Sequence, residues 1–191
     1  MLHIIGSIGP CAMPDGTSNT ACASERCVAG GISIRSDFAQ SVAAAFPSTN
    51  HNACELSGFT PQACLNLRAG SSYDTTQATV MTGTSGKRWY DGAPVFTWCN
   101  FILPPNAPAC ISGTGHGDPA LIPPSSNHTG GVNVAVCDGS VRFVSDTIGT
   151  GNLSGQPIGV NSGLCKRAGE SNFGPWGAFG SRNGGESIGA P

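Results

Sequence analysis

The chain has 191 residues, a length that suits one domain with a sizeable hydrophobic core. Only 10% of its residues are charged, whereas 28 Gly and 14 Pro together make 42 of the 191, well above average usage. The net charge is −2 with 9 basic residues scattered along the chain, which is not the pattern of a nucleic-acid-binding protein. No sequence period persists, so fibrous and coiled-coil classes are excluded. The composition indicates a turn-rich β or α+β domain.

The chain contains nine cysteines, and no two of them form a C-x-x-C pair typical of zinc or redox sites. With so few charged residues, this number favours disulfides formed in an oxidising compartment, and hence an exported protein. Three pairs are close enough in sequence to close small loops, but the sequence leaves the connectivity open: Cys22–Cys27, Cys54–Cys64 and Cys99–Cys110. The odd number leaves at least one cysteine unpaired or linked to another chain.

The start of the chain, residues 1–6, has no Lys or Arg and is not a secretory signal. The longest apolar stretch, Val95 to Leu103, is interrupted by polar residues and is far too short to span a membrane. We therefore predict no transmembrane segment in this sequence, and we expect any export leader to have been removed or to lie outside it.

Local signals predict the first elements in chain order. Pro14-Asp15-Gly16 is a turn signal, followed by an extended run towards Glu25. A helix is predicted from Asp37 to Phe46, because Ser36 or Asp37 offers an N-cap, Gln40 stands in capping-box register and Pro47 ends the pattern.

A second helix is predicted from Pro61 to Arg68, with Thr60 as N-cap and Gly70 beyond its end. Residues 70–92 resemble a loop. Val95 to Leu103 is rich in aromatic and β-branched residues and predicts a strand. Coil is expected from there to residue 126.

The clearest local signal is a β-hairpin between Gly131 and Ser145. Alternating valines precede Asp138-Gly139, and alternation resumes at Val141. A two-residue turn would pair Val136 with Val141 and Val134 with Phe143 on one face. Ala135 and Arg142 would then lie on the opposite face.

The tail from Gly151 to Pro191 is predicted to be mostly coil, with Trp176 and Phe179 anchored on the core. We therefore expect one α+β domain over residues 1–191. It would contain an antiparallel sheet, one or two short helices, many loops and several disulfides.

Candidate reactive groups are few and scattered. No nucleophile elbow Gly-x-Ser-x-Gly occurs. His116 and Asp118 are weak metal-ligand candidates in a glycine-rich loop, and Asp15 and Asp138 are weak calcium candidates because each precedes a turn glycine. Turn carboxylates more often bind nearby backbone N–H groups, so we expect no cofactor, with calcium as the alternative.

His128 and Asp138 invite comparison with a catalytic dyad. The intervening strand would span roughly 20 Å at ~3.3 Å per residue, which would place the two side chains at opposite ends of the hairpin. We therefore expect His128 to fix the loop that precedes the strand. A sugar-stacking platform is a further alternative to core burial for four aromatic residues: Trp89, Tyr90, Trp98 and Trp176.

The same polar residues carry a family resemblance. The spacing of His128 and Asp138-Gly139, with nine residues between them, resembles the C-terminal signature of a bacterial prepilin-like family of unknown function. Other matching blocks occur in the same order along the chain: Asp15-Gly16-Thr17-Ser18-Asn19-Thr20 with Glu25, Arg88-Trp89-Tyr90-Asp91-Gly92, Leu103-Pro104-Pro105-Asn106, the hairpin with Asn133 and Arg142, and Gly180-Ser181-Arg182-Asn183-Gly184-Gly185-Glu186.

Members of that family begin with a prepilin cleavage site and a long apolar helix, followed by a globular part resembling type II secretion pseudopilins. The resemblance implies that this chain corresponds to the globular part, without the helix, in the cell envelope or outside the cell. It implies pilin-like or other envelope partners and no catalytic residues. We therefore predict a non-enzymatic structural subunit of the cell surface or secretion apparatus. The alternative is an exported carbohydrate- or calcium-binding module.

Overall fold

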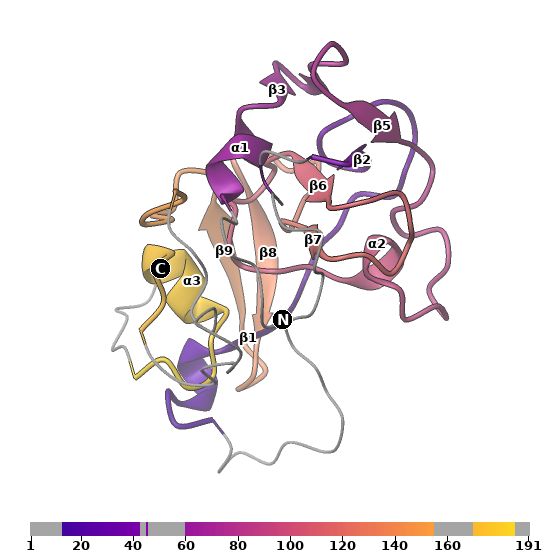
Figure 1. Ribbon diagram of the computed structural model, residues 1–191. Coiled ribbons are helices and arrows are strands. Elements are labelled where there is room, and N and C mark those ends of the chain that lie inside the picture. Colours follow the sequence, from indigo (N-terminus) through magenta and orange to yellow (C-terminus); the bar gives the residue numbers. More distant parts are fainter. Residues whose placement is uncertain (1–12, 43–44, 46–59, 155–169, 186–191) are drawn as a thin grey trace.

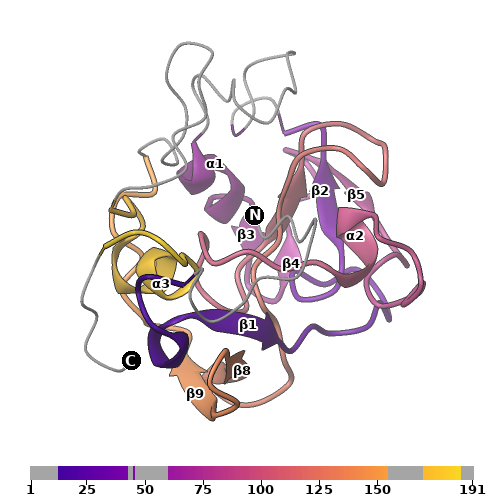
Figure 2. The same ribbon diagram turned by 90° about the horizontal axis from the view of Figure 1, so that it is seen from below.

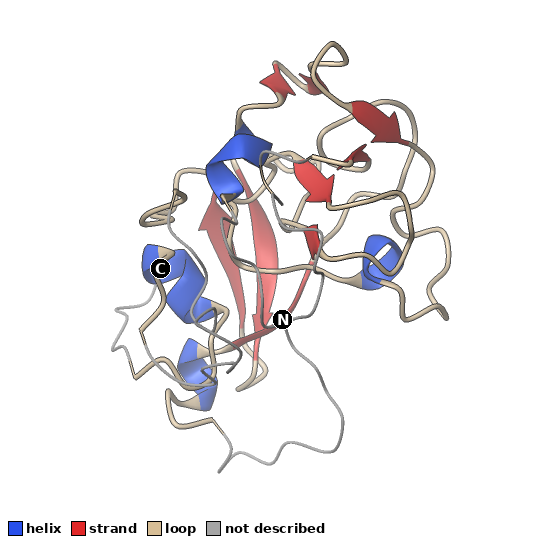
Figure 3. Ribbon diagram, viewed as in Figure 1, coloured by secondary structure: helices blue, strands red, loops and turns tan. Residues whose placement is uncertain are grey.

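The computed structural model describes residues 13–42, 45, 60–154 and 170–185, which form an α+β fold rich in loops. Figure 3 shows short helices around short strands, with loops making up much of the ribbon. The strands are β1 (Ala21–Ser24), β2 (Phe38–Gln40), β3 (Arg68–Ala69), β4 (Ser72–Tyr73), β5 (Thr79–Met81), β6 (Ala109–Ile111), β7 (Ala120–Leu121), β8 (Gly131–Val136) and β9 (Val141–Ser145). The α-helices are α1 (Pro61–Leu65), α2 (Pro94–Thr97) and α3 (Gly174–Phe179), and Thr17–Asn19 form a short 3-10 helix.

The predicted hairpin is confirmed as β8 and β9, which belong to a three-stranded antiparallel sheet in the order β1-β8-β9. Its predicted turn length is wrong. The observed pairs are Ala135 with Val141 and Val134 with Arg142, so three residues, 137–139, form the loop. Gly139 has a φ of 88° and closes a turn followed by a glycine bulge, a common alternative to the two-residue loop.

The extra loop residue moves the β9 side chains to the other face, as a register change of one residue must. Val144 is buried, whereas Val141 is 66% exposed and Phe143 is 52% exposed. The prediction that Val141 and Phe143 share the core face with Val134 and Val136 is therefore wrong.

Helix α3 covers the inner face of this sheet, and the two lie side by side in Figures 1 and 2. Trp176 and Phe179 are both completely buried against the valines of β8, which confirms their predicted role as anchors. Nε1 of Trp176 donates a 2.7 Å hydrogen bond to the carbonyl of Leu103, so the one polar atom of this ring is satisfied inside the core.

The second sheet has the order β5-β2-β6-β7, and its central strands β2 and β6 are buried on both faces. Phe38 and Ile111 lie on the face covered by α2, while Ala39 and Cys110 lie on the face covered by α1. Strand β2 pairs antiparallel with β5 and parallel with β6. Strands enclosed on both sides lack the alternation of a half-exposed strand, so sequence periodicity alone does not reveal them.

The predicted helix from Asp37 to Phe46 is wrong in its described part. The Asp37 carboxylate does not cap a helix: it accepts hydrogen bonds from the backbone N–H of Ser33 and Gly83. The chain then enters β2 as an extended strand, and Ser41 follows with a φ of 51°. Burial of Phe38 between two other strands therefore outweighs the helical spacing of the local apolar residues.

The predicted strand from Val95 to Leu103 is also wrong, because the short helix α2 covers its first residues. Pro94 occupies the first helical turn, where a missing N–H costs nothing. The side chain of Asp91 accepts a 3.0 Å hydrogen bond from the N–H of Ala93 just before the helix. Pro94 at the start of this segment is typical of a helix N-terminus, and the strand prediction did not take it into account.

Two regions predicted as loop or coil contain short strands. Residues 70–92 include β4 and β5, and the stretch before residue 126 includes β6 and β7. Helix α1 confirms the start of the predicted second helix at Pro61, although α1 ends at Leu65. No helix within the described ranges is long and apolar enough to cross a membrane.

Candidate functional site

The signature residue His128 lies beside Glu25, just beyond the end of β1. Nε2 of His128 is 3.1 Å from Oε1 of Glu25. The same carboxylate accepts 2.9 Å hydrogen bonds from the backbone N–H and from the side-chain amide of Asn133 in β8. Burial alone would raise the pKa of Glu25, but the hydrogen bonds from Asn133 and His128 outweigh burial and lower it. The ionised carboxylate therefore joins the end of β1 to the start of the hairpin.

A second group of side chains fixes the loop that leads into β8. Asn106 has a φ of 59°, and its side chain accepts the N–H of Ser126 at 2.9 Å and donates to Asp146 at 2.7 Å. The hydroxyl of Ser126 donates to the carbonyl of Gly131 and accepts the N–H of His128. Every polar atom named here serves a backbone group or a neighbour in this loop, as expected for buried polar groups.

Asp15 joins the two ends of the described chain. Its two carboxylate oxygens accept the backbone N–H groups of Gly184 at 2.7 Å and Gly185 at 2.9 Å. Nearby, Nη2 of Arg142 on β9 donates a 2.9 Å hydrogen bond to the carbonyl of Ser18. The turn signal at the start of the chain is thus bound to the glycine pair near its end.

Asp138 lies at the opposite end of the hairpin from His128. Its Oδ1 accepts the backbone N–H of Ser140 at 2.9 Å and the Ser140 hydroxyl at 2.7 Å. These hydrogen bonds lower the pKa of the Asp138 carboxyl. The predicted separation of His128 from Asp138 is confirmed, because each contacts a different partner at a different end of β8.

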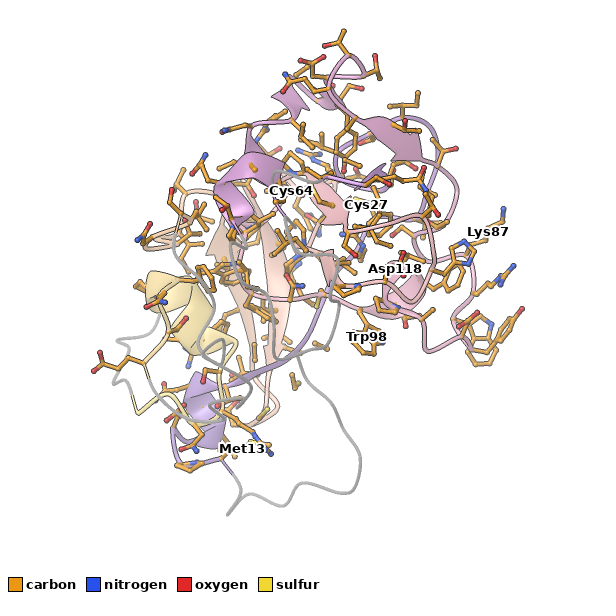
Figure 4. The ribbon with its side chains drawn as sticks, in the orientation of Figure 1. Met13, Cys27, Cys64, Lys87, Trp98 and Asp118 are labelled. Atoms are coloured by element: carbon orange, nitrogen blue, oxygen red, sulfur yellow. A yellow bond between two sulfur atoms is a disulfide. The ribbon has the colours of Figure 1, made fainter. Side chains whose placement is uncertain are left out.

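The weak metal-ligand candidates have other contacts. The ring of His116 packs against Phe96, with ring centroids 4.9 Å apart, and Oδ2 of Asp118 accepts the N–H of Gly115 at 2.8 Å. Figure 4 shows Asp118 on the α2 side of the molecule. In the part of the chain that the structure describes, no three His, Cys, Asp or Glu side chains are grouped so as to hold a metal ion.

The disulfide pairing differs from the pairs suggested by short sequence spacing. Cys64 in α1 bonds to Cys110 in β6, with their Cα atoms 6.0 Å apart despite a sequence separation of 46. The candidate Cys99–Cys110 is therefore wrong, because Cys110 is bonded to Cys64. Cys22 and Cys27 are not joined to each other in this structure, where both are free thiols. The pair Cys54–Cys64 is wrong because Cys64 is already bonded, and Cys54 itself lies outside the described residues. Packing of α1 on the second sheet sets this pairing, and sequence distance does not.

The four aromatic residues considered as a sugar platform do not share one surface. Trp176 is completely buried and Trp98 packs against the α2 side of the core, whereas Trp89 is 84% exposed and Tyr90 is 73% exposed. The rings of Trp89 and Tyr90 stand perpendicular, with centroids 5.8 Å apart. Their loop is fixed by backbone hydrogen bonds from Gly86 to Phe96 and from Asp91 to Arg88. Lys87 of this loop points away from the body of the molecule in Figure 4.

A buried polar cluster lies beside the second sheet, and no sequence motif predicts it. The Tyr73 hydroxyl donates to the carbonyl of Asp37 at 2.8 Å and accepts the N–H of Ala109 at 2.9 Å. The guanidinium of Arg26 is buried over the Phe38 ring, and burial lowers the pKa of Arg26 to about 10. Burial also raises the pKa of the Tyr73 hydroxyl. These contacts cross-link three strands and hold a positive charge near the buried Asp37.

A shallow cleft of about 310 Å³ lies beside the turn after Cys27. Val28, Ile32, Arg35 and Asn127 line it together with Cys27. The thiol of Cys27 hydrogen-bonds the side-chain oxygen of Asn127 at 3.7 Å. The lining of the cleft therefore combines the apolar side chains of Val28 and Ile32 with the amide of Asn127 and the guanidinium of Arg35.

Comparison with known proteins identifies the family. A family model described as a protein of unknown function (DUF1559) matches residues 4–151, more than three quarters of the chain. The chain belongs to this DUF1559 family. No curated protein and no solved structure matches it. The matched range includes the strands β1 to β9 and the Glu25–His128–Asn133 group, and it ends before α3.

Proposed function

We propose that this member of the DUF1559 family is a non-enzymatic structural subunit of the cell surface or secretion apparatus, with a globular head resembling that of a pseudopilin. Its partners would be other pilin-like subunits or envelope proteins. The head would offer a binding surface and would catalyse no reaction of its own.

One observation carries the proposal: the polar residues of the resembling motifs bind other parts of the same chain. Asp15 binds Gly184 and Gly185, Glu25 binds Asn133 and His128, and Asp138 binds Ser140. In a catalytic site, a nucleophile, a base and an orienting group converge on a pocket. Here each carboxylate accepts hydrogen bonds from groups of its own chain, which favours a structural role for the motifs.

The Cys64–Cys110 bridge supports the envelope setting, since such bonds persist in oxidising compartments. The exposed aromatic residues Trp89 and Tyr90 support the surface role. Large aromatic side chains that stay in water on a fixed loop are enriched at protein contacts.

Fractionation of the native organism tests the proposal. We expect the protein in the envelope or in material sheared from the surface, cross-linkable to other pilin-like chains. Deleting the prepilin peptidase should leave a precursor of higher mass and remove the protein from the surface. Equal mass in both strains, together with a monomeric cytoplasmic protein, would contradict the proposal.

The alternative, an exported carbohydrate-binding module, is favoured by Trp89 and Tyr90 alone, because exposed rings stack on sugars. A glycan array with the wild type and the Trp89→Ala variant tests it: signal that depends on Trp89 would support the module. Calcium binding through Asp15 or Asp138 is tested by thermal melting with calcium and then with a chelator, since a ligand of the folded state raises the midpoint.

A further inference from the structure

Strand β1 is the edge strand of the hairpin sheet, and its pairing with β8 contains an irregularity at Cys22. Ala21 pairs with Val136 and Ala23 pairs with Ala135, so Cys22 is the extra residue of a β-bulge. The Cys22 thiol lies 3.4 Å from the carbonyl oxygen of Ala135. A bulge changes the direction of a side chain, and here it directs the Cys22 thiol towards β8.

Cys137 directly follows the last residue of β8 and lies at the same end of the β1–β8 pairing as Cys22. Its backbone N–H donates a 2.8 Å hydrogen bond to the carbonyl of Thr20. Ala21 and Val136 face the core, while Cys22 is exposed and Cys137 is half-buried, so both thiols lie on the outer face. The contact of Cys22 with Ala135 and the hydrogen bond of Cys137 to Thr20 therefore place the two cysteines next to each other across the β1–β8 pairing.

We propose that Cys22 and Cys137 are a second disulfide pair, which closes in an oxidising compartment and fastens β1 to the hairpin. Adjacent antiparallel strands bring Cβ atoms to the separation that a disulfide needs. This inference concerns the thiols alone and goes beyond the proposed function: the pair would close in the isolated protein whether or not the protein assembles with other subunits.

The bond forms by thiol–disulfide exchange with an oxidised dithiol protein or with oxidised glutathione. The thiolate of Cys22 attacks the disulfide of the oxidant and forms a mixed disulfide, releasing one sulfur of the oxidant as a thiol. The thiolate of Cys137 then attacks the Cys22 sulfur and releases the second. Two protein thiols are oxidised, one disulfide of the oxidant is reduced to two thiols, and the protons pass to those thiols.

The environment of the two sulfurs assigns the order of the steps. Burial and the neighbouring Cys22 raise the pKa of the Cys137 thiol, which lowers its thiolate fraction at neutral pH. Cys22 is exposed and therefore meets the oxidant first, with Cys137 as the resolving thiol.

Closure would change how the edge strand is held. Only three residue pairs join β1 to β8, and short edge strands are prone to local opening. The Cys64–Cys110 bridge lies in the other sheet and does not restrain β1. A bond at Cys22 would therefore protect the first described strand of the chain from detaching.

Peptide mapping of the purified, oxidised chain tests the pair. Cleavage before Asp and after Lys or Arg isolates Cys22 on residues 15–26, Cys27 on residues 27–35 and Cys137 on residues 118–137. After equilibration in glutathione buffers and alkylation of free thiols, we expect peptides 15–26 and 118–137 to be linked. The link should open at a more oxidising glutathione ratio than Cys64–Cys110, because exposed disulfides are the more easily reduced.

The matched variants are Cys22→Ser and, as a control on the same segment, Cys27→Ser. At a glutathione ratio that opens the Cys22–Cys137 link but leaves Cys64–Cys110 closed, and again under fully oxidising conditions, Tm is measured for each variant. Closing the link should raise the Tm of the wild type and of Cys27→Ser by roughly 5–10 °C, and should leave the Tm of Cys22→Ser unchanged. Alkylation of Cys22 and Cys137 in oxidised protein whose Cys64–Cys110 bridge is closed would overturn the proposal. A link from either residue to a different cysteine would overturn it as well.

Discussion

The two larger sheets of this molecule are stabilised in different ways. The sheet β5-β2-β6-β7 is enclosed by α1 and α2 and held by the Cys64–Cys110 bond and the buried Tyr73 hydroxyl. The sheet β1-β8-β9 is covered by α3 on one face only, and its outer face carries Phe143 and the His128–Glu25 pair. Ionised and amide side chains join its strands to distant loops.

This difference between the two larger sheets indicates that the family motifs have a structural role. A sheet buried on both faces gains its stability from packing, and sequence variation there is limited mainly by volume. A half-exposed sheet with an edge strand needs further restraint. The motif carboxylates supply that restraint by binding backbone N–H groups of other segments, so their presence does not require a reaction.

Removing the aromatic anchor of the hairpin sheet should have the largest effect. Trp176→Ala leaves a cavity beneath the valines of β8 and removes the hydrogen-bond donor of the Leu103 carbonyl. The substitution should lower the free energy of unfolding by about 3–5 kcal/mol. Trp89→Ala, which removes the same ring from an exposed loop, should change stability by less than about 0.5 kcal/mol. Urea unfolding of the two variants measures the difference.

Breaking the bond of the other sheet should have the next largest effect. The double variant Cys64→Ser with Cys110→Ser removes the cross-link between α1 and β6, and should cost about 2–4 kcal/mol. Thermal unfolding by circular dichroism measures the loss. The variant should lower the Tm under oxidising conditions far more than under reducing conditions, and an equal loss in both would show that poorer packing of Ser is responsible.

Neutralising the central carboxylate should have a smaller effect. Glu25→Gln retains one acceptor oxygen but weakens the hydrogen bonds to Asn133 and His128, and should cost about 1–3 kcal/mol. The exposed Glu170 provides a matched control, since Glu170→Gln should lie within about 0.5 kcal/mol of the wild type. Chemical denaturation of both variants decides whether Glu25 restrains the fold.

Acid should remove the same restraint gradually. The pKa of Glu25 in the folded protein is below its ordinary value of 4.5, so the unfolded chain binds a proton more readily. The resulting stability is present above about pH 4.5 and is lost as the pH falls through the lower pKa of the folded state. The free energy of unfolding should therefore decrease below pH 4.5 less steeply in Glu25→Gln than in the wild type.

The sequence predicted those parts of the fold that depend on neighbouring residues. The alternation before Asp138-Gly139 predicted the hairpin, and Pro61 predicted the start of α1. The turn length at residues 137–139 was missed because Asp-Gly suits both two-residue and three-residue loops. That single residue decides which face Phe143 occupies.

The rest of the fold depends on contacts between distant segments. The burial of Phe38 between β5 and β6, and the approach of Cys64 to Cys110, involve residues far apart in the chain, so local patterns do not contain them. In the candidate site, the sequence placed His128 and Asp138 at opposite ends of the hairpin. It did not reveal that Glu25 is the partner of His128.

The most direct test of the claim that motif carboxylates restrain the backbone is amide hydrogen exchange at Gly184 and Gly185 in Asp15→Ala, measured by NMR. Asp15 accepts both N–H groups. Their exchange should accelerate by about tenfold or more, while the amide of Asn133, bound to Glu25, should keep its wild-type rate. Unchanged exchange at both glycines would contradict the account.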